Sequence, residues 1–143
     1  MFCLKNISKL FILLFITTSC SYHRGEPPSM KMSRYMVSGE RLFATHCENC
    51  HQKDGQGLRN LYPPLAGTDF ISKNFDEVLC IIQNGSPGNM TINEVTYNLP
   101  MPPSKLSHLE IAEIATYISN SWGNEMGISE VNTVRKKLEN CRK

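Results

Sequence analysis

The stretch Ala44–Gly57, ATHCENCHQKDGQG, places two cysteines one helical turn apart and a histidine directly after the second. Three chemistries use two cysteines at this spacing. A thioredoxin-like redox pair follows a β-strand, and no convincing strand precedes Cys47. A structural zinc site draws a second pair of ligands from elsewhere in the chain, and none is found at zinc spacing. The pattern C-x-x-C-H favours covalent haem, because Cys47 and Cys50 can each bond one vinyl group while His51 lies under the iron.

A haem that carries electrons needs a second axial donor, and a thioether would raise its reduction potential relative to a second nitrogen. Three methionines follow the motif at a distance, at Met90, Met101 and Met126. Met101 lies among three prolines in LPMPPSKLS, so its backbone is stiff and can hold a soft ligand against iron. Met90 lies in a glycine-rich stretch and Met126 lies beyond the last strong helical pattern, so loose packing or surface exposure is the simpler role for both. The sequence therefore predicts His51 and Met101 as the axial ligands.

The N-terminus is typical of an export signal, because two lysines precede the apolar run Leu10–Ile16, which is too short to span a bilayer. Cys20 follows this run and resembles the lipobox cysteine of bacterial lipoproteins, although Thr17 stands where that family usually has an aliphatic residue. The resemblance implies that residues 1–19 are a signal peptide and that Cys20 is lipidated. A plain secretory signal is the alternative. Both alternatives place the mature chain outside the cytoplasm, where thiols tend to be oxidised.

Length and charge limit the remaining possibilities. A chain of 143 residues favours one domain with a modest core. Its formal net charge is +2, and removal of Lys5 and Lys9 with the signal leaves equal numbers of basic and acidic residues, which argues against a nucleic-acid binder. Residues 20–35 are polar, contain two prolines and show no regular period, so we expect a lipidated tether there. The folded domain is then expected at 36–143.

The folded part shows mainly helical patterns, with one weaker alternation. The helical patterns cover 36–47, 74–84, 107–122 and 129–140. Ser107 and Glu110 stand at capping-box spacing before the third of these, and Asn74 and Glu77 do so before the second. The alternation on either side of Asn93-Glu94 predicts a short β-hairpin.

The order of these features resembles that of class I c-type cytochromes of the small bacterial monohaem kind. The matching features are a helix, CENCH, a glycine-rich turn, PPLAG, a short helix, MPP and LSHLEIAEIATYISNSWGN. The resemblance covers about residues 36–138. It implies an all-α class I cytochrome c fold with a minor β-hairpin and an extra C-terminal helix. It also implies one haem c, with thioether bonds at Cys47 and Cys50 and the iron bound by His51 and Met101.

The same resemblance implies two structural contacts. A backbone carbonyl of the pair Pro63-Pro64 is expected to accept the hydrogen bond of the His51 imidazole. Gly39 and Phe43 match the glycine and the aromatic residue that let the first helix cross the C-terminal helix closely, near Tyr117.

The function that the resemblance implies is one-electron transfer, without a substrate site and without catalysis. The expected partners are a redox protein that donates the electron, another that accepts it, and a membrane reached through lipidated Cys20. The chain would act in the periplasm or at a membrane surface. The alternative is the haem subunit of a dehydrogenase, reductase or oxidase complex. A haem sensor or peroxidase, with an open sixth position, is the third hypothesis.

Two cysteines remain after these assignments, Cys80 and Cys141. Cys80 points away from the apolar face of the helix expected at 74–84, and Cys141 continues the apolar stripe of the last helix. If the last helix lay over the outer side of the helix at 74–84, the two sulfurs would meet. Two separate thiols are the alternative, because the sequence does not show whether the Cα atoms come within the roughly 7 Å that a disulfide requires.

Overall fold

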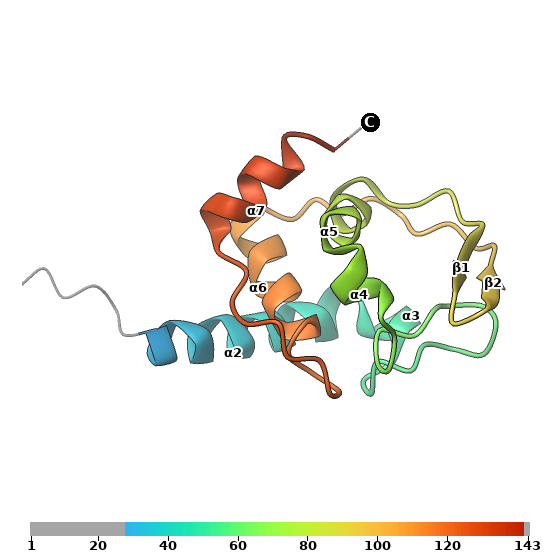
Figure 1. Cartoon of the computed structure of the whole chain (residues 1–143), viewed down its shortest axis with the longest axis horizontal. Coiled ribbons are helices and arrows are strands. Elements are labelled where there is room, and N and C mark those ends of the chain that lie inside the picture. The colour runs from blue at the N-terminus through green and yellow to red at the C-terminus, as the bar shows by residue number, and fades with distance from the viewer. Residues whose placement is uncertain (1–27, 142–143) are drawn as a thin grey trace, which may run out of the picture.

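The computed structural model describes residues 28–141, and the predicted signal peptide and Cys20 lie outside these residues. The described part consists of helices with one small antiparallel sheet (Figure 1). The elements are α2 (Pro28–His46), α3 (Glu48–His51), α4 (Phe70–Lys73), α5 (Phe75–Asn84), β1 (Met90–Ile92), β2 (Val95–Tyr97), α6 (His108–Ile118) and α7 (Val131–Leu138). This architecture confirms the predicted fold. Within residues 28–141, every helix is too short or too polar to cross a bilayer.

The first helix begins well before its predicted start, and this corrects the boundary placed after residues 20–35. α2 starts at Pro28, a favourable first helical residue because the N–H that proline lacks would have no partner there. Tyr35 is buried in the core, and Lys31 forms a 2.5 Å ion pair with Glu130 near the other end of the chain. Residues 28–35 are therefore part of the folded domain, held by contacts with residues distant in sequence.

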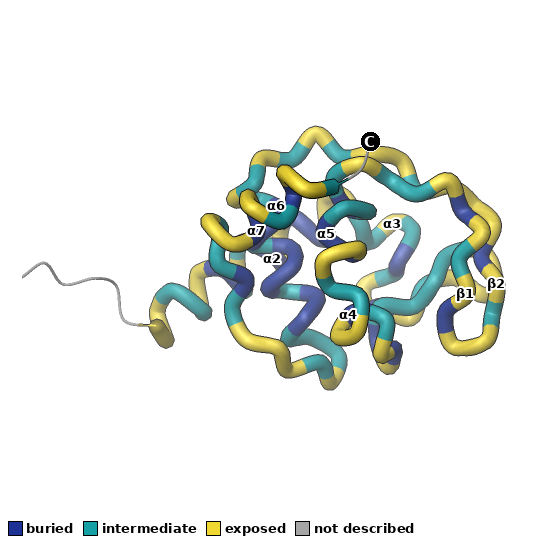
Figure 2. The backbone as a smooth tube through the Cα atoms, turned by 45° about the horizontal axis from the view of Figure 1, so that its top comes forward, coloured by how far each residue is buried: buried dark blue, intermediate teal, exposed yellow. Residues whose placement is uncertain are grey.

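The crossing of α2 over α6 forms the centre of the molecule, and Figure 2 shows buried backbone concentrated there. A Cβ atom on Gly39 would lie 2.2 Å from the Glu113 carbonyl oxygen and 2.7 Å from the Tyr117 Cβ, so only glycine permits this approach. Phe43 is buried beside it, with its ring centroid 5.5 Å from that of Tyr117. The close crossing implied by the resemblance is confirmed.

The capping box predicted for α6 is present. The Ser107 hydroxyl accepts from the Glu110 N–H, and the Glu110 carboxylate accepts from the Ser107 N–H. The helix ends at Ile118, short of the predicted end at 122. Trp122 has a left-handed backbone with φ of 54°, which ends any helical continuation.

The helix α5 is capped differently from the prediction. No capping box forms at Asn74, because the short helix α4 precedes it and the Asn74 amide donates to the Phe70 carbonyl instead. α5 ends as predicted at Asn84, and Gly85 takes φ of 76° after it. Its buried residues are Val78, Leu79 and Ile82.

The predicted hairpin is formed by β1 and β2. Met90 pairs with Tyr97, Thr91 with Thr96, and Ile92 with Val95. Both turn residues are left-handed, Asn93 at φ 49° and Glu94 at φ 64°, so Glu94 adopts a conformation that usually favours glycine. Figure 1 places this hairpin at the opposite end of the molecule from the start of α2.

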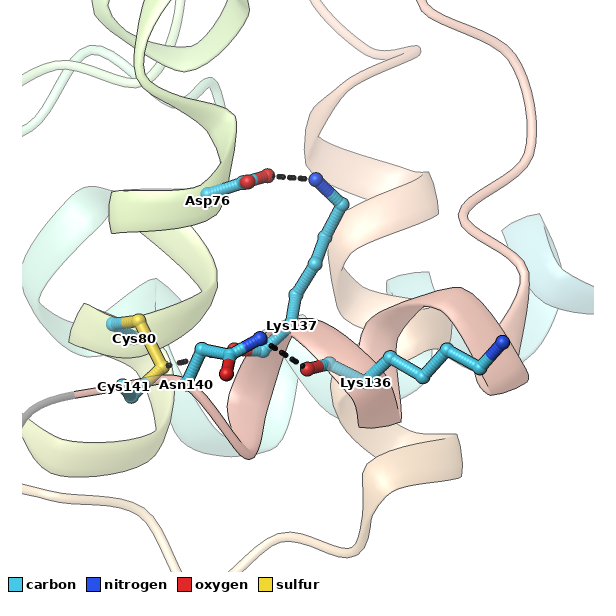
Figure 3. Close-up of a disulfide and its surroundings, with 6 residues drawn as sticks. All are labelled: Asp76, Cys80, Lys136, Lys137, Asn140 and Cys141. Atoms are coloured by element: carbon cyan, nitrogen blue, oxygen red, sulfur yellow. Dashed lines mark hydrogen bonds and ion pairs between the residues drawn. A yellow bond between two sulfur atoms is a disulfide. The ribbon is translucent and has the colours of Figure 1, made fainter.

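The C-terminal helix α7 packs on α5, and a disulfide joins Cys80 to Cys141 (Figure 3). Their Cα atoms are 5.4 Å apart, inside the range that a disulfide requires. Lys137 of α7 also forms an ion pair with Asp76 of α5. Of the two alternatives left open by the sequence, the structure contains the disulfide.

Candidate functional site

A large apolar pocket lies between α3, α5, α6, the hairpin and the segment 99–102. Its space, open mouth included, is about 980 Å³. Its polar lining groups are hydroxyls, two thiols and one imidazole. None of the lining residues in the described part of the chain is Asp, Glu, Lys or Arg. The pocket therefore suits a large apolar group held by a few specific donors.

The motif CENCH lies at the turn from α2 into α3. The Cys47 N–H bonds the Phe43 carbonyl at 2.8 Å, and the His51 N–H bonds the Cys47 carbonyl at 2.9 Å, so one tight turn presents all three side chains to the pocket. Cys47 and Cys50 are free of disulfides. Burial, with a smaller contribution from Cys50, raises the pKa of the Cys47 thiol to about 11. Because neither forms a disulfide, both thiols are available for covalent attachment.

His51 is buried, and its ring is fixed by one hydrogen bond. Nδ1 donates to the Pro63 carbonyl at 3.0 Å, which confirms the contact expected with the pair Pro63-Pro64. Burial lowers the pKa of His51, and the Pro63 hydrogen bond offsets this only in part. The ring is therefore neutral, and its other nitrogen, Nε2, keeps a lone pair that can bind a metal.

Two glycines of the motif allow the following loop to fold back under His51. The Gly57 N–H bonds the His51 carbonyl at 2.9 Å, and a Cβ on Gly57 would lie 2.2 Å from the Tyr62 carbonyl oxygen. The Gly55 carbonyl accepts hydrogen bonds from two N–H groups of the segment 65–66, at 2.7 and 3.0 Å. These contacts place the Pro63 carbonyl at the imidazole.

Trp122 supports this loop from the far end of the chain. A Cβ on Gly55 would lie 2.6 Å from Cε3 of the indole, so the ring packs directly on the glycine. The indole also lies against Phe43, with ring centroids 5.2 Å apart. The sequence did not predict this contact, because nothing local in the chain connects residue 122 with the motif CENCH.

Met101 lines the same pocket as His51. Its backbone N–H and carbonyl each pair with Ser86 at 2.9 Å, which fixes the proline-rich segment against the end of α5. A Cβ on Gly85 would lie 2.4 Å from the Met101 carbonyl oxygen, so this glycine is also needed for the approach. The site therefore combines two thiols, an imidazole and a thioether in one cavity.

The other two candidate methionines differ from each other. Met126 is 40 % exposed and lies outside this pocket. Met90 is half-buried and lines the pocket, a position that the sequence did not predict. Alternation along β1 could have found it, because Met90 and Ile92 lie on the same face of the strand and both line the cavity.

The two other chemistries considered for the cysteine pair find no support in the described residues. These contain no group of three or more His, Cys, Asp or Glu side chains that could hold a metal ion. The segment before Cys47 is the helix α2, not a strand.

The family model described as cytochrome C oxidase, cbb3-type, subunit III matches residues 36–118. The chain belongs to the class I c-type cytochromes. Members of this family carry a covalently bound haem c with iron, and the donor set of the pocket fits that group.

Curated relatives come from both small and large cytochromes. Cytochrome c-552 of Thermus thermophilus is 30% identical over 93 residues, which cover 62% of this chain and 70% of that protein. The cytochrome c subunit of the quinone alcohol dehydrogenase of Gluconacetobacter polyoxogenes is 31% identical over 93 residues, or 62% of this chain and 19% of the subunit. The cbb3-type oxidase subunit CcoP of Rubrivivax gelatinosus is 29% identical over 89 residues, which cover 62% of this chain and 26% of that subunit. The chain thus matches only about a fifth to a quarter of the length of the two larger subunits.

Proposed function

We propose that this chain is a one-electron carrier in which Cys47 and Cys50 hold haem c through thioether bonds and His51 and Met101 bind its iron. The iron supplies a reversible one-electron change when the haem is bound. The chain holds both axial donors in place, excludes water with an apolar pocket, and fixes the imidazole through the Pro63 carbonyl. No catalytic group is needed for this role.

The observation that carries this proposal is the donor set of one cavity. The two thiols are unpaired, the imidazole is fixed through Nδ1, and a thioether on a stiff segment lines the same space. This combination suits a redox carrier, since it can keep both axial positions filled in both oxidation states.

The proposal is tested on protein expressed with a haem c maturation system. We expect the haem to survive extraction with acidified acetone and denaturing electrophoresis, because two thioether bonds hold it. The variant Cys47→Ala/Cys50→Ala should yield no covalent haem, whereas the matched variant Cys80→Ser/Cys141→Ser should retain it. Haem that washes out of the wild type contradicts covalent attachment.

The open-site alternative, a haem sensor or peroxidase, is tested on the same preparation. A carrier with two filled axial positions should show the weak near-infrared sulfur-to-iron band when oxidised. Its ferrous form should bind carbon monoxide poorly at neutral pH. Tight carbon monoxide binding by the wild type would favour a sensor or peroxidase.

A second candidate is the haem subunit of an oxidoreductase complex. The relatives that favour it are named as cytochrome subunits of quinone alcohol dehydrogenase, fructose dehydrogenase and cbb3-type oxidase. In both roles, redox proteins donate and accept the electron. Purification from native membranes under mild conditions separates the two roles. A stable complex with a catalytic subunit supports the second, and a monomeric haem protein supports the first.

Export and membrane attachment through Cys20 are also part of the proposal. They are supported by the apolar run and by the likeness to a lipobox. Labelled palmitate should enter the wild type and not Cys20→Ser, and the variant should be released from membranes. A wild type that is soluble and unlabelled would leave an ordinary secreted cytochrome.

A further inference from the structure

A second methionine of the pocket has no part in the proposed function. Met90 begins β1 and lines the cavity together with His51 and Met101. Among the methionines of residues 28–141, Met90 and Met101 are the two that line it. A thioether is a soft donor that binds haem iron. The pocket therefore holds one thioether more than a six-coordinate iron needs.

Ser86 connects the two thioether residues. Its backbone pairs with that of Met101 through two hydrogen bonds of 2.9 Å, and its hydroxyl donates to the Met90 sulfur at 3.3 Å. The Met90 sulfur thus lies beside the residue that holds Met101 in place. Because a thioether is a weak acceptor, this hydrogen bond restrains the sulfur only lightly.

The strand that carries Met90 is attached in a way that permits a small shift. Within residues 28–141, β1 pairs with β2 alone, and each strand has three residues. A hairpin of two strands has little stability of its own. The Asn93 amide at its turn donates to the Gly67 carbonyl over 3.4 Å, at the long end of hydrogen-bond distances. Movement of the Met90 sulfur therefore requires no rearrangement of the helices.

We propose that Met90 is a reserve axial ligand of the haem iron. When the Met101 sulfur is not available to the iron, the Met90 sulfur binds in its place, so that the bond between iron and Met101 is replaced by a bond between iron and Met90. The exchange adds and removes no electron or proton. It rests on the proposed function, since it requires haem attached at Cys47 and Cys50. Its effect is that a thioether stays on the iron and the sixth position stays closed.

The test compares four haem-loaded proteins: the wild type, Met101→Ala, Met90→Ala and the double variant. Met126→Ala is the matched control, because this methionine is exposed and lies outside the pocket. The near-infrared sulfur-to-iron band is measured in the oxidised proteins and carbon monoxide affinity in the reduced ones. We expect the band in Met101→Ala and its loss only in the double variant. Carbon monoxide should bind the double variant more than about tenfold more tightly than Met101→Ala, because no internal donor competes there.

Two results would overturn the inference. The first is an identical spectrum and carbon monoxide affinity for Met101→Ala and the double variant. The second is loss of the band in Met90→Ala together with its retention in Met101→Ala, which would make Met90 the resident ligand. Failure of the proposed function gives a different result, because the wild type itself would then lose its haem in acidified acetone.

Discussion

The side of the pocket that carries His51 and the side that carries Met101 differ in how they are held. We define the His51 wall as residues 47–66 and the Met101 wall as residues 85–101. The His51 wall closes on itself through several backbone hydrogen bonds and is supported by Trp122 from the loop after α6. The Met101 wall depends on one backbone pair, Ser86 with Met101, and on a two-stranded hairpin. The difference indicates that loss of contacts in the His51 wall destabilises the rest of the fold, whereas loss of contacts in the Met101 wall affects that wall alone.

The largest expected effect on stability comes from removal of the disulfide. This bond holds α5, which runs directly into the Met101 wall. Cys80→Ser/Cys141→Ser opens a loop with a sequence separation of 61 residues. The chain-entropy model gives a loss of about 4 kcal/mol in the free energy of unfolding. Denaturant unfolding measures this loss, and amide hydrogen exchange should rise more in α5 and at 85–101 than at 47–66. Equal increases in both walls would contradict the comparison.

Gly57→Ala tests the His51 wall directly. The new Cβ would lie 2.2 Å from the Tyr62 carbonyl oxygen, and φ of 68° disfavours alanine. We expect a loss of about 3 kcal/mol and a poor yield of holoprotein, since a backbone clash adds to the left-handed conformation. Gly67→Ala is the control, because φ is 63° there but nothing lies within 4 Å. It should cost about 1 kcal/mol. Equal losses for the two variants would show that the loop contacts are not limiting.

Trp122→Ala tests the support behind that wall. The indole is partly exposed, so we expect a loss of about 2 kcal/mol, below the range for a fully buried tryptophan. The Pro63 carbonyl should then hold the His51 imidazole less firmly, which weakens its donation to ferric iron and raises the reduction potential. Trp122→Phe should restore most of both values. A fall in stability with an unchanged potential would mean that Trp122 contributes packing alone.

The smallest expected effect concerns Ser107, where the chain that follows Met101 enters α6. Ser107→Ala removes an N-cap and should cost about 1 kcal/mol. Hydrogen bonds from the Ser107 N–H and hydroxyl hold the pKa of Glu110 below its usual value. A lowered pKa means that this contribution is present above the ordinary carboxyl range and is lost as pH falls through the folded pKa.

Glu110→Gln is the matched variant for the acid dependence, because the amide oxygen can still accept these hydrogen bonds but does not titrate. The difference in stability between the wild type and Glu110→Gln should shrink as the solution is acidified, when measured by thermal unfolding. A difference that does not change with pH would contradict the role of the charged carboxylate.

The sequence predicted features that depend on short stretches of chain. The helix that leads into Cys47, the capping box of Ser107 with Glu110 and the hairpin at Asn93-Glu94 are all specified by neighbouring residues. The contact between His51 and Pro63 was expected from the family resemblance alone, and no pattern in the loop between them predicts it.

The features that the sequence did not predict depend on distant contacts. α2 begins at Pro28 because Tyr35 is buried and Lys31 pairs with Glu130, and no local pattern signals either contact. Met90 enters the pocket because the hairpin folds over it. The contact of Trp122 with Gly55 likewise joins two ends of the domain. Whether Cys80 meets Cys141 could not be decided before the packing of α7 on α5 was known.

The position of the disulfide has a consequence for biosynthesis. The described residues contain four cysteines, and under the proposed function Cys47 and Cys50 must stay reduced until haem is attached. Several mispaired isomers are possible among four cysteines. Of the single disulfides that they can form, only Cys80–Cys141 leaves both motif thiols free. Because the docking of α7 on α5 brings that pair together, folding favours this disulfide and, under the proposed function, leaves both motif thiols free for haem attachment.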